Sequence, residues 1–109
     1  MKKIALLLLP SLILSGCKPS ESEIIDFGMN EVRSSIKDPN LVVFDAFYIG
    51  SDEKSGHVCG KIVGKDFADE YEYFYVHIEM DKDNSLRGDP VFFVKDQKSK
   101  DNYKIICIR

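Results

Sequence analysis

Residues 71–80 carry the pattern that most constrains the fold of this chain, because two sets of side chains alternate along them. Successive side chains of a strand point to opposite faces of a sheet, so this segment predicts a β-strand. We expect one set to face the core and the other to lie on the opposite face. The core set is Phe74, Val76, Ile78 and Met80, and the opposite set is Tyr71, Tyr73, Tyr75, His77 and Glu79.

Strand-type patterns continue on both sides of this segment. From residue 41 onward, apolar and aromatic runs are separated by turn-rich clusters at distances typical of hairpins. Connections this short favour antiparallel neighbours. The predicted strands are Leu41–Ile49, His57–Gly64, Tyr71–Met80, Val91–Lys95 and Tyr103–Ile108.

A single helix is predicted before the strands. Ser20 and Glu23 have the spacing of a capping box, which predicts a helix that starts at about Glu21 and ends at Asp38-Pro39. Gly28 weakens such a helix, and we interpret it as a point of close contact with the sheet. The spacing of the apolar residues places four of them on one helical face: Ile25, Met29, Val32 and Ile36.

The N-terminus has the anatomy of a secretory signal peptide. Lys2 and Lys3 precede an apolar stretch over residues 4–14, and the segment Leu14-Ser15-Gly16-Cys17 follows. This segment resembles the lipobox of bacterial lipoproteins. The resemblance implies that Cys17 is lipidated and that residues 1–16 are removed. A transmembrane helix needs roughly 20 apolar residues, so the stretch is too short for one; a plain signal peptide with an incidental cysteine is the other alternative.

The remaining chain is expected to be one lipid-anchored domain. Removal of 16 of the 109 residues leaves 93, which we divide into a tether over residues 17–20 and a single domain over residues 21–109. Loss of Lys2 and Lys3 changes the net charge from −3 to −5, which argues against nucleic acid as a partner. We expect the domain to be attached to the membrane through the lipid anchor on Cys17. In a Gram-negative cell, Lys18 in place of aspartate implies the outer membrane, on the side that faces the periplasm.

Cys59 and Cys107 remain once Cys17 is assigned to lipid. In an oxidising compartment two such cysteines indicate one disulfide. Two buried free thiols, or a metal pair formed with His57, are the alternatives. The disulfide conflicts with a flat five-stranded sheet, since strands two and five would lie three spacings of about 4.8 Å apart and the bond needs Cα atoms within about 7 Å.

We therefore expect either a sheet that curls or a last strand that is out of sequential order. Reduced cysteines are the third possibility. The predicted fold class is α+β, with the N-terminal amphipathic helix packed on a curled, mainly antiparallel sheet of about five strands.

Several short motifs between residues 32 and 76 are similar to a family of small, uncharacterised secreted or lipid-anchored bacterial and phage proteins. They are Lys37-Asp38-Pro39, Phe44, Val58-Cys59-Gly60-Lys61-Ile62, Lys65-Asp66, Tyr71 and Phe74. The resemblance implies a shared fold and no particular activity. Members of the family carry a second cysteine near the end of the chain, and Cys107 matches it. The chain departs from the family at Leu41 and Val42 and near Asp69, Glu70 and Tyr73.

The sequence offers little support for catalysis or metal binding. His57 and His77 are the only histidines, and neither has the spacing of a nucleophilic triad. The acidic segment 81–89 superficially resembles a calcium loop, but Leu86 and Phe92 stand where glycine and glutamate are required. We therefore predict no catalytic residue, cofactor or metal site.

The face of the third strand carries the candidate binding residues Tyr71, Tyr73, Tyr75 and His77. Tyrosine is concentrated at interfaces because it offers large rigid area with a polar tip, although a second layer covering this face is the alternative. The favoured function is a noncatalytic envelope lipoprotein that binds another envelope protein, including the exclusion type found on phages and plasmids. An inhibitor of an enzyme such as lysozyme, and a small hydrolase, are the other hypotheses.

Overall fold

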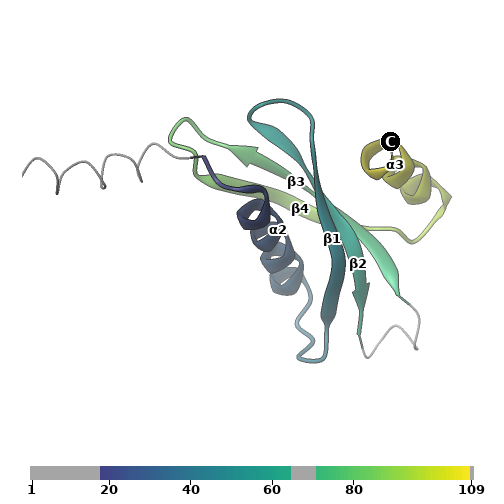
Figure 1. Ribbon diagram of the computed structural model, residues 1–109. Coiled ribbons are helices and arrows are strands. Elements are labelled where there is room, and N and C mark those ends of the chain that lie inside the picture. Colours follow the sequence, from purple (N-terminus) through teal and green to yellow (C-terminus); the bar gives the residue numbers. More distant parts are fainter. Residues whose placement is uncertain (1–17, 65–70, 109) are drawn as a thin grey trace, which may run out of the picture.

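A computed structural model describes residues 18–64 and 71–108 of the chain. Four strands form an antiparallel sheet in sequential order, with one helix on each face (Figure 1). The predicted α+β class, the N-terminal helix and the antiparallel sheet are confirmed, but the sheet has four strands and is not curled. The elements are α2 (Glu21–Ser35), β1 (Val42–Gly50), β2 (Ser55–Val63), β3 (Glu72–Met80), β4 (Leu86–Phe93) and α3 (Gln97–Cys107).

Helix α2 begins where the capping box predicts. The backbone N–H of Glu23 donates to the Ser20 hydroxyl at 3.2 Å, and the backbone N–H of Ser20 donates to the Glu23 carboxylate at 2.8 Å. These two bonds satisfy donors that the first helical turn leaves without partners. They also lower the pKa of Glu23, because they favour its charged form.

In the first turns of α2, the buried face is shifted by one residue from the predicted face. Ile24, Gly28 and Val32 are buried, whereas Ile25 is half-buried. The reason is the close approach of the helix at Gly28, where a Cβ atom would lie 2.6 Å from the Cβ of Val58. The predicted contact between this glycine and the sheet is therefore confirmed, and it turns the helix so that its glycine faces β2.

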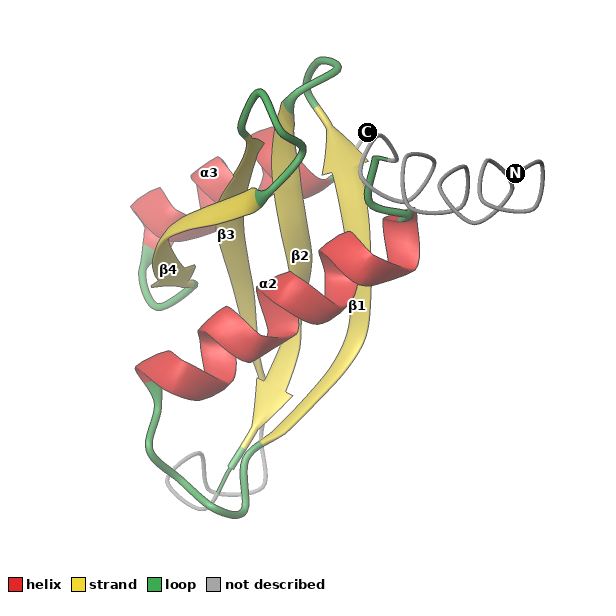
Figure 2. Ribbon diagram, turned by 90° about the vertical axis from the view of Figure 1, so that its left-hand side faces the viewer, coloured by secondary structure: helices red, strands yellow, loops and turns green. Residues whose placement is uncertain are grey.

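The main core lies between α2 and one face of the sheet (Figure 2). The core set predicted for residues 71–80 faces this helix: Phe74, Val76 and Ile78 are buried, and Met80 packs against them. Burial of this apolar surface is the largest favourable contribution to the stability of so small a domain.

A bulge in β1 keeps its apolar side chains on the correct faces. The pairing with β2 shifts between Phe44 and Phe47, and Asp45 has a positive φ of 52°. One extra residue in a strand inverts the alternation that follows it. As a result Val43 and Ala46 both pack into the main core, although residues three positions apart point to opposite faces of a regular strand.

Strand β4 begins earlier than the predicted strand Val91–Lys95. The chain reverses over residues 81–85, where Asn84 has a positive φ of 67° and the backbone N–H of Asp81 donates to the carbonyl of Ser85 at 2.9 Å. Pairing between β3 and β4 is irregular between Val76 and Ile78, opposite the segment that contains Pro90. Proline is tolerated at this break because it has no N–H to donate to the neighbouring strand. The same irregular segment is the reason that the predicted strand begins too late, at Val91.

The predicted strand Tyr103–Ile108 is wrong, because these residues lie in and directly after α3. Asp96 caps the helix by accepting a hydrogen bond from the backbone N–H of Ser99 at 2.9 Å, and the Ser99 hydroxyl accepts one from the backbone N–H of Asp96 at 3.0 Å. Tyr103 and Cys107 are buried four residues apart, which is helical spacing. Two exposed isoleucines, Ile105 and Ile108, mask the helical spacing of Tyr103 and Cys107 in the sequence. The run at the end of the chain is therefore apolar almost throughout, which is typical of a strand.

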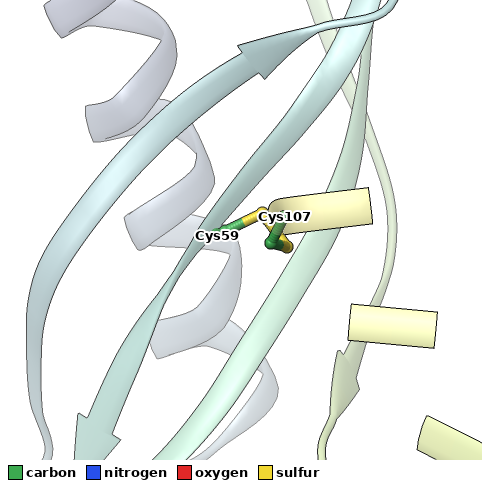
Figure 3. The surroundings of a disulfide bond; sticks show 2 residues. All are labelled: Cys59 and Cys107. Carbon is green, nitrogen blue, oxygen red and sulfur yellow. A yellow bond between two sulfur atoms is a disulfide. The ribbon is translucent and has the colours of Figure 1, made fainter. Parts of the chain in front are cut away.

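Helix α3 also explains how Cys59 and Cys107 form a disulfide without a curled sheet. Helix α3 lies on the face of the sheet opposite α2 (Figure 1), so Cys107 of this helix reaches Cys59 of β2 from that face and not from a neighbouring strand. The Cα atoms are 6.1 Å apart. Both expected solutions, curling and a displaced last strand, are therefore wrong, and the bond joins the C-terminal end of α3 to the middle of β2 (Figure 3).

Candidate functional site: a groove beside helix α3

The face of the sheet beneath α3 carries a second, smaller cluster of buried side chains. Cys59, Tyr75, Tyr103 and Cys107 form its centre. Tyr75 is 7% exposed, stacks on Phe92 with ring centroids 5.2 Å apart, and lies 6.4 Å from the ring of Tyr103. Burial raises the pKa of Tyr103 above its ordinary value. Tyr75 thus packs under α3, as the alternative of a covering layer anticipated.

Tyr71 and Tyr73 extend from this cluster toward the surface. Tyr71 is 49% exposed, whereas Tyr73 is half-buried with its ring 4.8 Å from that of Tyr103. Their hydroxyl groups are 3.5 Å apart, and this hydrogen bond raises the pKa of Tyr73. The four candidate residues on this strand therefore differ in accessibility, with Tyr71 at the surface and Tyr75 covered.

Lys61 lies beside these two tyrosines. Its ammonium nitrogen is 5.0 Å from the ring centre of Tyr71 and 5.7 Å from that of Tyr73, within the range of cation–π attraction. It also donates a hydrogen bond to Asp45 at 3.3 Å, which raises the pKa of Lys61. The positive φ of Asp45 in the β1 bulge places this carboxylate where it meets the lysine.

A groove of about 490 Å³ runs between α3 and the sheet. Its apolar and aromatic lining comes from β1, β3 and α3 and from the residues that directly follow β4 and α3: Phe47, Tyr73, Tyr103, Val94 and Ile108. Three lysines complete it, namely Lys61 from β2 and Lys100 and Lys104 from α3. We call this set of residues the α3 groove. Phe47 is 37% exposed and Ile108 is 59% exposed, so the apolar surface of the groove is accessible.

The groove was not predicted from the sequence, because its helical wall was assigned to a strand. Once residues 97–107 are helical, Lys100 and Lys104 lie one turn apart on the same side of the helix, and Ile108 follows four positions later at its C-cap. This spacing is visible in the sequence. The Asp96 and Ser99 pair at the start of the helix is the signal that could have revealed it.

His77 lies on the same face as the tyrosines but takes part in a charged network. Its Nε2 atom is 3.1 Å from one carboxylate oxygen of Glu79, and the other oxygen accepts a hydrogen bond from Arg87 at 2.8 Å. Arg87 donates a second bond to Asp81 at 3.0 Å. The rings of His57 on β2 and His77 on β3 lie opposite each other and meet edge to face, with centroids 4.9 Å apart. Glu79 of β3 and Arg87 of β4 lie opposite each other and link those two strands at the surface.

Side chains of the acidic segment 81–89 bond to one another. The Ser85 hydroxyl donates to Asp83 at 2.7 Å, and Ser85 and Arg87 both bond to Asp81.

Within residues 18–64 and 71–108, no three His, Cys, Asp or Glu side chains gather in a way that could hold a metal ion. In the same part of the chain, no helix has the length and apolar character needed to cross a membrane. Cys17 lies outside the described residues.

No protein-family model, curated protein or solved structure matches this chain.

Proposed function

We propose that the chain is a lipid-anchored lipoprotein of the bacterial cell envelope whose domain binds another envelope protein without catalysing a reaction. The lipobox-like segment that ends at Cys17 supports the anchor. Several acyl chains on one residue give stable membrane attachment, whereas a single chain binds only marginally. In a Gram-negative host, the residue Lys18 favours the outer membrane, with the domain in the periplasm.

The start of helix α2 supports a domain held close to the bilayer. The capping box fixes the first turn of the helix at Glu21, so residues 17–20 form the whole tether between the acylated cysteine and the fold. At most about 3.5 Å per residue, this tether spans on the order of 14 Å. The domain would therefore meet partners that are themselves at or near the membrane surface.

The single observation that carries the binding function is the α3 groove. An accessible recess with aromatic walls and positive charge at its rim has the composition of protein-recognition sites, in which tyrosine and other aromatic anchors dominate. The likeness to small secreted and lipid-anchored bacterial and phage proteins agrees with a place in the envelope. An exclusion protein of a mobile element is one form of the proposed binding role.

Photo-crosslinking in living cells tests this proposal. A benzoylphenylalanine replaces Ile105, which is exposed on α3, and in a matched control it replaces Ser34 on the exposed side of α2. We expect one discrete crosslinked envelope protein from position 105, none of the same mass from position 34, and loss of the product in a Cys17→Ala background. Absence of any crosslinked protein from either position, in cells that contain the folded and lipidated chain, would contradict the proposal.

A further inference from the structure

We propose that the α3 groove recognises an acidic peptide segment of the partner that carries an apolar side chain. This inference rests on the proposed function and names the chemistry of the partner at that site. The proposed ligand is a peptide whose carboxylates contact the lysines while one apolar side chain enters the recess.

The charge of the groove opposes that of the chain. The sequence as a whole has a net charge of −3, yet among the described residues the charged side chains that line this recess are three lysines. The nearby acidic groups of α3 are engaged elsewhere: Asp96 caps the helix at Ser99, and Asp101 accepts a hydrogen bond from Gln97 at 2.9 Å. Within residues 18–64 and 71–108, no carboxylate pairs with Lys100 or Lys104. At Lys100 and Lys104 an incoming carboxylate would therefore meet ammonium groups that are not already neutralised, whereas Lys61 is paired with Asp45.

The walls of the groove provide the apolar half of the site. Phe47 and Ile108 remain partly exposed, and the ring centroids of Tyr73 and Tyr103 lie 4.8 Å apart. A volume of about 490 Å³ lies within the range of pockets that take a small ligand or a few side chains. Aromatic walls beside lysines suit a segment in which acidic residues flank an apolar one.

An anionic lipid surface is the competing occupant, because lysines and exposed isoleucines also occur together on membrane-binding helices. The arrangement of the layers favours the peptide. Helix α2, which follows the tether, and helix α3 lie on opposite faces of the sheet (Figure 1, Figure 2). The recess between helix and sheet also admits side chains, whereas a bilayer presents a broad surface that would rest on the outside of α3.

The test measures peptide binding by fluorescence anisotropy with the full chain in nonionic detergent. The probe is a fluorescein-labelled peptide of four acidic residues around one phenylalanine, and a second probe has glycine in place of the phenylalanine. The groove variant is Lys100→Glu with Lys104→Glu. Its matched control is Lys82→Glu with Lys98→Glu, which makes the same change in net charge at exposed lysines outside the groove.

We expect the groove variant to bind the phenylalanine peptide about tenfold more weakly, because two favourable charge contacts become repulsive. The control variant is expected to change the affinity by less than about threefold, since its charges lie farther from the site and are screened by salt. Phe47→Ser should weaken binding of the phenylalanine peptide and leave the glycine peptide unaffected. Equal losses in both double variants, or equal affinity for both peptides, would overturn the inference.

Glycerol phosphate added as a competitor separates the two occupants. If glycerol phosphate displaces the labelled peptide at the same concentration as unlabelled peptide does, the proposed peptide ligand is refuted and a lipid headgroup is favoured. The crosslinking experiment keeps this result distinct from the proposed function. If the crosslinked partner persists when Lys100 and Lys104 are both changed to Glu, the groove inference fails and the binding function stands.

Discussion

Removal of the bond between Cys59 and Cys107 is expected to destabilise the domain by about 4 kcal/mol. The two cysteines are 48 positions apart, so the bond closes a loop of 49 residues. The chain-entropy relation for a loop of this length gives about 4 kcal/mol at 25 °C. This is a large part of the ~5 to 10 kcal/mol that separates the folded and unfolded states of a domain of this size.

The packing of α3 adds a local consequence. The helix contacts the sheet mainly through Tyr103, Ile106 and the disulfide itself, while Ile105 and Ile108 are exposed. Without the bond, so few contacts would not hold an 11-residue helix firmly, because isolated helices of this length are marginal in water. We therefore expect α3 to open at lower free energy than the sheet once the bond is lost.

Urea unfolding measures both effects in a Cys17→Ala background, which removes the third thiol. The oxidised protein is compared with the same protein under dithiothreitol and with Cys107→Ala, and unfolding is followed by circular dichroism at 222 nm. Hydrogen exchange then reports amide protection along α3. Unfolding free energies that agree within about 0.5 kcal/mol between the oxidised and reduced forms, with equal protection of α3, would refute this reasoning.

Two further predictions concern the helices. Gly28→Ala should lower the free energy of unfolding by about 1 to 3 kcal/mol, because the new Cβ would overlap Val58; Gly50→Ala, whose Cβ would meet only ordinary contacts at 3.5 Å, is the control and should change it much less. Hydrogen bonds from Ser99 lower the pKa of Asp96, so its contribution to α3 is present above the ordinary carboxyl pKa and lost as the pH falls through the folded value. Protection of α3 amides should therefore decrease in acid, and Asp96→Asn should make this decrease smaller; a pH dependence unchanged by the substitution would contradict the role of the cap.

Local signals in the sequence were sufficient for most of the fold. The alternation along β3 and the capping box at Ser20 are set by neighbouring residues, so both could be predicted correctly. Gly28 indicated the close contact between α2 and β2 because a glycine inside a helix needs a packing reason.

The errors arose where tertiary contacts decide between local possibilities. Residues 103–108 contain an apolar run that fits a strand or a helix, and the contact of Tyr103 and Cys107 with the second face of the sheet selects the helix. The α3 groove was missed for the same reason, because Phe47 and Lys104 line one recess only when that helix is in place. The disulfide was predicted from the number of cysteines, and its geometry required the layer that the sequence did not reveal.

Metabolic labelling is the most direct test of the central claim that Cys17 carries the membrane anchor. Cells that express the chain are grown with radiolabelled palmitate, and the protein is isolated and compared with its Cys17→Ala form. We predict label in the wild type only, a mass that corresponds to loss of residues 1–16 with acyl chains added, and recovery in the membrane fraction. An unlabelled wild type, or a Cys17→Ala form that matures and fractionates identically, would contradict the account.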